Sequence, residues 1–172
     1  MKASGREALF VEWIEEFEGI IFKMVRAYAV DRSDQDDLFQ EIALQLWLSI
    51  PSFQGRSKPS TWIYKVALNT AFVWRRKEGK QRSPSEIPLE NSEESASGPN
   101  PAKAAEDRED LAWLYDELRA LDKIDRSVAL LYLDDVSYRD MAEILGLSES
   151  NIGVRVHRLK KQLAEGYARR TK

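Results

Sequence analysis

The sequence predicts an all-α protein made of two small helical domains joined by a flexible linker. Glycine is scarce, with 8 residues among 172, and apolar residues recur mostly at spacings of three, four and seven, which is typical of amphipathic helices. No segment carries a convincing strand pattern. Residues 78–103 lack apolar periodicity and are dominated by Pro, Ser, Glu and Gly, as expected of a linker between two folded parts.

The first predicted domain, residues 1–77, contains three helices. Pro51 ends the second of them, because proline cannot continue a helix interior. A loop over residues 52–59 follows, and the Ser60 hydroxyl suits the cap of the third helix. The apolar spacing places the three helices at residues 7–29, about 34–50 and about 60–77.

The second predicted domain, residues 104–172, contains four shorter helices. Ser137 opens one of them with Asp140 three positions later, a weak capping box, and Gly146 ends it. Ser148 then caps the last helix, so two helices flank a short turn in the helix-turn-helix layout. The predicted spans are 104–121, 126–133, 137–145 and from Ser148 to about 168.

Composition excludes several classes of function. There is no cysteine, and His157 is the only histidine, which rules out disulfides, thiolate zinc sites and multi-histidine metal sites. No nucleophile–base pair or phosphate-cradling glycine loop is visible, so an enzyme is not expected, and neither is a cofactor. No apolar run approaches the roughly 18–20 residues that span a bilayer, and glutamates interrupt the N-terminus where a signal peptide would be apolar. We therefore expect a cytoplasmic protein without membrane insertion.

The net charge of −3 hides a strong pattern. Residues 42–77 carry six basic side chains and no acid, and residues 150–172 carry seven basic side chains and only Glu165 as an acid. Between them, residues 78–110 carry four basic and nine acidic side chains. Two separated basic segments favour two contacts on one polyanion, although solvated helix faces are the simpler alternative.

The last helix has two distinct faces. An apolar stripe that begins at Ile152 and ends at Leu163 should face the core. The remaining face has short polar residues near its N-terminus and cations further along, as a recognition helix needs for base edges and phosphates. The residues on this face are Ser150, Val154, His157, Arg158 and Lys161. The predicted contacts to DNA also include Asn151 and Arg155.

The helix over residues 60–77 carries a second candidate DNA surface. A cation, an amide, an aromatic ring and another cation follow at spacings of four, three and four on one face. This combination suits phosphates together with an unstacked base. The four residues are Lys65, Asn69, Phe72 and Arg76.

An acidic cluster lies at residues 31–41. Asp37, Gln40 and Glu41 share one helical face there. Carboxylates at such spacing are compatible with magnesium or calcium, but no second cluster completes a coordination sphere. A polar docking face for a basic partner is the better interpretation.

In this order, the features resemble bacterial sigma factors of the extracytoplasmic-function (ECF) class. Residues 34–77 contain a DLxQE piece, an FxG and a TWxYKxAxNTA run, which are similar to sigma region 2. Residues 121–163 contain SYxxMAxxLGLS, which is similar to the helix-turn-helix of region 4. The pair is far more specific than a lone helix-turn-helix.

The resemblance implies partners and roles. Asp37, Gln40 and Glu41 would face the β′ clamp helices of core RNA polymerase, and region 4 would meet the β flap. The last helix would read the minus-35 promoter element, the loop over residues 54–59 would hold a flipped base, and an anti-sigma factor is expected. The minus-10 element would be contacted by Arg56, Lys65, Asn69, Phe72, Arg75 and Arg76.

Two positions depart from the family pattern. Members often have Leu-Pro where this chain has Leu121-Asp122, and many have Lys or Arg at Gly153 in the recognition helix. Glycine there removes a phosphate contact and costs about 1 kcal/mol of helix propensity.

Two other classes of protein compete with the sigma-factor interpretation. A free-standing helix-turn-helix regulator usually needs a dimerisation helix, which is not apparent, and an interaction module leaves the two basic segments unexplained.

Overall fold

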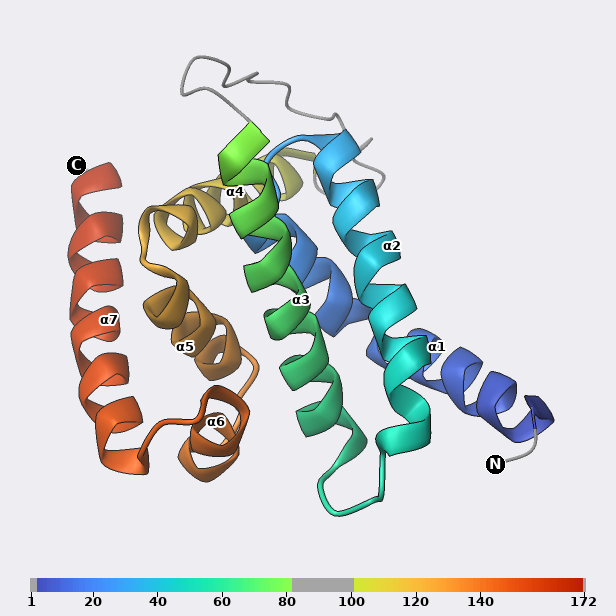
Figure 1. The fold of residues 1–172 in the computed structure, drawn as a ribbon. Helices are drawn as coiled ribbons and strands as arrows, with labels where there is room; N and C mark the ends of the chain where they lie inside the picture. The colour runs from blue at the N-terminus through green and yellow to red at the C-terminus, as the bar shows by residue number, and fades with distance from the viewer. Residues whose placement is uncertain (1–2, 82–100, 172) are drawn as a thin grey trace.

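The computed structural model describes residues 3–81 and 101–171, and these residues form helices joined by short loops (Figure 1). The prediction of an all-α fold is confirmed. Four helices in the second half form a unit beside three in the first half. In chain order the elements are α1 (Ala3–Tyr28), α2 (Arg32–Ser49), the short 3-10 helix η1 (Ile50–Ser52), α3 (Pro59–Gln81), α4 (Pro101–Ala120), α5 (Lys123–Leu133), α6 (Tyr138–Leu145) and α7 (Glu149–Arg170).

Helices α1, α2 and α3 pack against one another, and their buried side chains form one part of a hydrophobic core that continues into the second half. Leu38, Ile42 and Leu46 of α2 are buried, and Trp47 is half-buried. Trp47 lies edge-on to Phe10 and beneath the Arg6 guanidinium, which is 4.0 Å from its ring centre. The core of this part is built from Trp13, Ile21, Met24, Leu38, Ile42, Leu46, Ile63, Ala67 and Leu68.

Helix boundaries differ from the sequence predictions where a cap or a kink was overlooked. Helix α1 is interrupted at Phe17, whose backbone (φ −113°, ψ 16°) is not helical. Helix α2 begins at Arg32 because the Asp31 carboxylate caps it, accepting a hydrogen bond from the Asp34 amide at 2.9 Å. Helices also enter both ends of the segment predicted as linker, since α3 continues to Gln81 and α4 begins at Pro101. The rest of that prediction, residues 82–100, lies outside the described residues.

Helices α4 to α7 contribute the other part of the hydrophobic core, and the residues that cap α6 and α7 were correctly predicted. The Ser137 and Ser148 hydroxyls accept from the backbone amides three residues later, at 3.1 and 3.2 Å. Gly146 ends α6 in the left-handed conformation (φ 67°), which glycine adopts without strain. Helix α5 begins three residues earlier than expected, because Asp122 caps it by accepting from the amides of Ile124 and Asp125. The core of this part is built from Leu118, Val128, Leu131, Met141, Ile152, Val156 and Leu159.

The two halves meet through contacts of α1 with α4 and α5, and of α3 with α6. Most of the polar links run between side chains and helix ends. Asp134 follows α5 and accepts from the Tyr64 hydroxyl on α3 while pairing with Lys23 on α1. Burial raises the pKa of Tyr64 to about 12, so its phenol remains a donor at neutral pH. The Tyr28 hydroxyl lies 2.8 Å from Ser127 Oγ.

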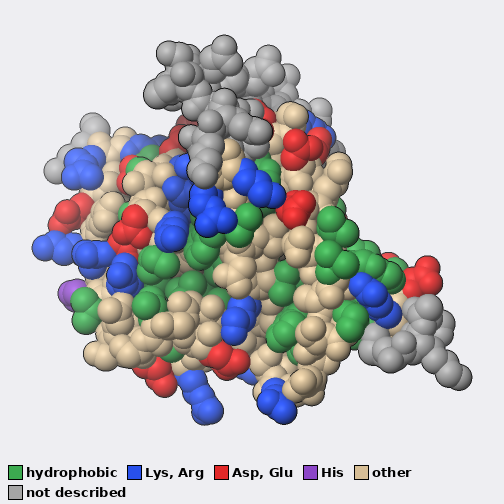
Figure 2. Space-filling view, viewed as in Figure 1, with side chains coloured by type: hydrophobic (Ala, Val, Ile, Leu, Met, Phe, Trp, Pro, Cys, Tyr) green, Lys and Arg blue, Asp and Glu red, His purple; other side chains and the backbone are tan. Residues whose placement is uncertain are grey.

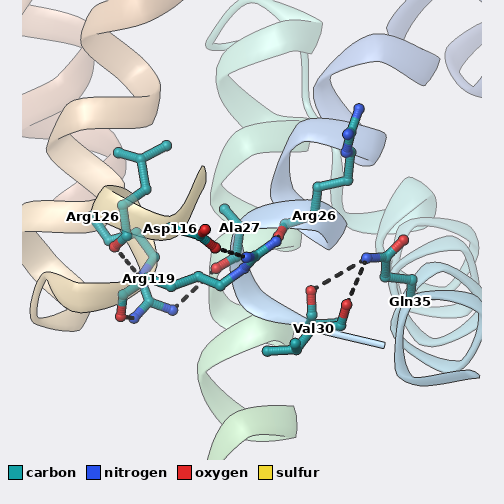
Figure 3. Close-up of polar contacts among 9 residues, drawn as sticks. Arg26, Ala27, Val30, Gln35, Asp116, Arg119 and Arg126 are labelled. Carbon is teal, nitrogen blue, oxygen red and sulfur yellow. Dashed lines mark hydrogen bonds and ion pairs between the residues drawn. The ribbon is translucent and has the colours of Figure 1, made fainter. Parts of the chain in front are cut away.

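Two arginines of the second half bind the carbonyl end of α1 (Figure 3). Arg119 donates to the Arg26 carbonyl at 3.3 Å, and Arg126 donates to the Ala27 carbonyl at 3.2 Å. Arg126 is buried, and it also donates to the carbonyls of Leu118, Arg119 and Leu121. Its desolvation lowers the pKa of the guanidinium. Cations at the end of a helix complement its dipole and satisfy its last carbonyls.

None of the described helices is long and apolar enough to cross a membrane.

Candidate nucleic-acid interface

Helix α3 presents an exposed basic face. Lys65, Asn69, Arg75 and Arg76 are all exposed, and Arg56 is exposed in the loop before the helix. Figure 2 shows lysine and arginine side chains gathered over the upper part of α3 and α4 and along α7. Within residues 3–81 and 101–171, the cations at positions 65, 75 and 76 form no ion pair. Their charge is therefore available to phosphates.

Phe72 occupies a different position from the rest of this set. Its ring is half-buried and lies edge-on to Tyr28, with 5.9 Å between ring centres. The Lys123 ammonium of the second half lies 5.4 Å from the centre of the same ring. The structure thus covers Phe72 with residues of α1 and α5. An unstacked base could reach its face only if these neighbours moved.

Helix α7 also exposes the face predicted for DNA. Ser150, Val154, His157 and Lys161 are all exposed, and 68% of Val154 is accessible to solvent. Asn151 is exposed at the start of the helix. An apolar side chain this exposed suits a methyl group such as that of thymine in the major groove. The face can offer hydroxyl and amide groups to base edges, and cations to phosphates.

Arg155 and Arg158, which are predicted for the same surface, both bind the carboxylate of Asp125 on helix α5. Arg155 Nη1 binds Asp125 Oδ1, and Arg158 Nη2 binds Asp125 Oδ2. Arg155 Nε also donates to Asn151 Oδ1 at 2.7 Å. The side chain of Asp125 is only 9% exposed, whereas that of Arg158 is 61% exposed. These arginines are therefore oriented by the protein.

Sequence reasoning missed Asp125 because the predicted helix began at Arg126, one residue after it. Two signals could have found it. Asp122 is a good N-cap, so Asp125 falls three residues on, in the first turn of α5, where acidic residues are favoured. Arg155 and Arg158 are also three apart and share a helix face, which places both within reach of one carboxylate.

Gly153 lies on the side of α7 that faces α6. A Cβ atom at this position would be 3.7 Å from the Tyr138 ring, an ordinary van der Waals contact. Gly153 is thus not required by the packing. Gly166 is different, because a Cβ atom there would lie 3.2 Å from the Trp113 ring.

The acidic face of α2 is partly exposed. Asp37 and Gln40 are exposed, whereas Glu41 is half-buried and accepts a hydrogen bond from Gln45 at 3.0 Å. The same stripe continues with two exposed leucines, Leu44 and Leu48. Among the described residues, no group of three or more acidic or histidine side chains is arranged to hold a metal. The stripe has the mixed acidic and apolar character of a protein-docking surface.

Family models match both halves of the chain. The model described as Sigma-70 region 2 matches residues 13–81, and the model described as Sigma-70, region 4 matches residues 111–163. The first match contains α2 and α3, and the second contains α5, α6 and most of α7.

Two curated relatives are similar over most of their length. The ECF RNA polymerase sigma-E factor of Haemophilus influenzae is 25% identical over 166 residues, which cover 92% of this chain and 87% of that protein. The ECF RNA polymerase sigma factor SigX of Bacillus subtilis is 26% identical over 160 residues, which cover 91% of this chain and 80% of that protein.

Two solved structures share the fold. The sigma factor RpoE in complex with the anti-sigma factor NepR from Bartonella quintana has a TM-score of 0.71 at 19% identity, covering 92% of this chain and 96% of that one. CnrH in complex with the cytosolic domain of CnrY has a TM-score of 0.67 at 21% identity, covering 95% of this chain and 90% of that one.

Proposed function

This chain belongs to the ECF class of sigma factors, which direct promoter-specific transcription initiation without catalysing a reaction, and we propose that its two domains, 1–77 and 104–172, contact separate parts of one promoter. The observation that carries this proposal is the pair of exposed polar and basic faces on α3 and α7, one in each domain. Each face combines cations with groups able to contact bases, as sequence-specific DNA binding requires.

The acidic stripe on α2 is the proposed docking site for core RNA polymerase. Asp37, Gln40 and Glu41 would bind the β′ clamp helices, and the exposed Leu44 and Leu48 would add apolar contact beside them. Charge complementarity at the rim speeds association and selects the partner, while the apolar groups supply buried area. The second domain would bind the β flap.

The exposed face of α3 is the proposed contact with the minus-10 element. Arg75 and Arg76 would bind phosphates, and Asn69 would pair with a base edge or the displaced strand. Arg56 and the loop over residues 54–59 would receive a flipped base. Phe72 would join this surface only after the Lys123 ammonium leaves its ring, through a change of its rotamer or a movement of the second domain.

Helix α7 is the proposed reader of the minus-35 element. Its N-terminal groups would contact base edges, with Val154 against a thymine methyl, and Lys161 would bind a phosphate. The segment 78–103 would join the two domains. Its acidic residues would repel DNA and favour a basic channel of the polymerase.

Two further features follow from the same assignment. We propose that the protein works in the cytoplasm, where core polymerase is found, and that an anti-sigma factor regulates it. The sigma factor from Bartonella quintana, which shares this fold, was crystallised with such a factor.

The docking proposal is tested by reversing charge on α2. Asp37→Lys and Glu41→Lys, singly and together, should weaken binding to core polymerase in a titration with fluorescently labelled protein. Asp107→Lys is the matched control, because it makes the same charge change at an exposed position of α4. Core affinity that is unchanged in the double variant, with the fold intact by circular dichroism, would contradict the proposal.

A further inference from the structure

Asp125 joins two arginines of α7 to the first turn of α5. Each of its carboxylate oxygens takes one guanidinium, and its own backbone amide donates to the Asp122 carboxylate at 2.9 Å. We propose that Asp125 is a positioning residue for minus-35 recognition, which fixes the orientation of Arg155 and Arg158 on the DNA-facing helix. This inference rests on the proposed function of α7.

The hydrogen bonds around Asp125 form a continuous chain along α7. Asn151 accepts from Arg155, Arg155 and Arg158 both donate to Asp125, and Asp125 lies under the helix in α5. Arg155 is the more enclosed of the two, with 27% of its side chain exposed. It therefore acts mainly as a spacer between Asn151 and Asp125.

Of the two arginines, Arg158 is the one that can reach DNA. It uses Nη2 on Asp125, and 61% of its side chain is exposed. A guanidinium has five N–H donors in a rigid planar fork, so the contact through Nη2 narrows the orientations of the group and leaves its other donors available to DNA. An arginine held in this way loses less side-chain entropy when it contacts a base than a freely rotating one.

Burial keeps the arginines on Asp125 when DNA is near. A buried carboxylate without a partner is costly, so a phosphate that drew both arginines away would leave that charge uncompensated. The three side chains therefore act as a unit with a net charge of +1 rather than +2. The arginines then contribute direction more than charge to the complex.

The Asp125→Asn variant should change two properties of DNA binding, the specificity ratio and the salt dependence. The variant should lower the ratio of specific to non-specific binding, because the arginines lose their orientation. It should also steepen the dependence of log K on log salt by about 0.9, because the unit gains one net positive charge. The specificity ratio is the readout of positioning, because removing a negative charge beside the DNA steepens the salt slope whatever its structural role.

The experiment uses holoenzyme assembled from the full chain and core polymerase. Binding is measured by fluorescence anisotropy at several salt concentrations, on a promoter fragment and on one with the minus-35 element scrambled. Asp125→Asn should reduce the specificity ratio about tenfold, and Arg158→Ala should reduce it less in that variant than in the unaltered chain. Asp107→Asn, at an exposed position of α4, is the matched control and should leave both quantities unchanged.

A conservative variant covers the case in which Asp125→Asn unfolds. Asp125→Glu keeps the carboxylate but displaces it by one methylene, so it should retain the salt slope and show a smaller loss of specificity. A specificity ratio that is kept or raised in both variants would overturn the inference, since Asp125 would then be neutral or would compete with DNA. If Arg155→Ala and Arg158→Ala also leave minus-35 binding unchanged, the proposed function of α7 fails as well. If only the Asp125 variants are silent, the inference fails alone.

Discussion

Helices α3 and α7 both expose basic side chains, but those on α3 extend freely into solvent whereas two on α7 are held in place by ion pairs. On α3, the cations at positions 65, 75 and 76 extend into solvent and form no ion pair with another described residue. On α7, Arg155 and Arg158 are tied to a buried carboxylate. A solvated cation contributes charge, whereas an oriented guanidinium contributes geometry. We therefore expect α3 to contribute mainly salt-dependent affinity and α7 to contribute mainly sequence discrimination.

Arg126 is more buried than any arginine of α3 or α7, and its role is structural. Arg126 is buried and donates to four backbone carbonyls across both halves. Arg126→Leu should lower the free energy of unfolding by about 3 kcal/mol, because buried acceptors lose charged donors. Urea denaturation followed by tryptophan fluorescence measures this. A loss below about 1 kcal/mol would show that water replaces the guanidinium.

The comparison itself is tested with one arginine from each helix. Arg158→Ala should weaken binding to a promoter by about 1–3 kcal/mol and relax specificity at minus-35. Arg76→Ala should weaken binding to all DNA about equally, with the salt slope reduced by about 0.9. Anisotropy titrations of holoenzyme on specific and scrambled DNA separate the two. Equal effects of both variants on the specificity ratio would remove the distinction between the helices.

Two glycines test how the turn and recognition helix are built. Gly146→Ala should destabilise the protein by about 1 kcal/mol, because its φ of 67° is strained for a residue with Cβ. Gly153→Ala should stabilise it by up to about 1 kcal/mol, since alanine is the better helix former and the Tyr138 ring leaves room. Thermal unfolding should show shifts of opposite sign. A destabilised Gly153→Ala variant would show that the added methyl group clashes with the Tyr138 ring.

The smallest effect is expected between the domains, at Lys58 and Asp140. This pair is 3.2 Å apart, with 72% of the Lys58 side chain exposed, so Lys58→Ala should cost at most about 0.5 kcal/mol. The hydrogen bond from Lys58 lowers the pKa of Asp140 in the folded state. Its contribution is therefore present above the carboxyl's ordinary pKa near 4 and disappears as pH falls through the lower folded value. Unfolding measured from pH 7 to pH 3 should show the variant approaching the unaltered protein at the acid end.

Local signals in the sequence predicted much of the fold. Ser137, Gly146 and Ser148 were identified as helix ends because capping depends on a few neighbouring residues. The start of α5 was missed because Asp122 was considered only as a departure from a family pattern. Local reasoning identified most of the residues that face outward on α3 and α7, but not the partial burial of Phe72 and Arg155.

Tertiary contacts account for what sequence reasoning could not supply. The cover over Phe72 comes from Tyr28 and Lys123, which are distant in the chain. The partner of Arg158 lies 33 residues away, on another helix. Neither contact can be predicted from helical periodicity, which indicates only the face of the helix on which a residue lies.

Helices α3 and α7 are proposed to contact two different elements of one promoter. Site-specific photocrosslinking tests this most directly, with a photoreactive amino acid at Asn69 or Val154 in otherwise unaltered holoenzyme. Both positions are exposed, so the probe should not disturb the core. We predict that position 69 crosslinks to the minus-10 element and position 154 to the minus-35 element. Crosslinks from both positions to one element, or from neither to promoter DNA, would contradict the account.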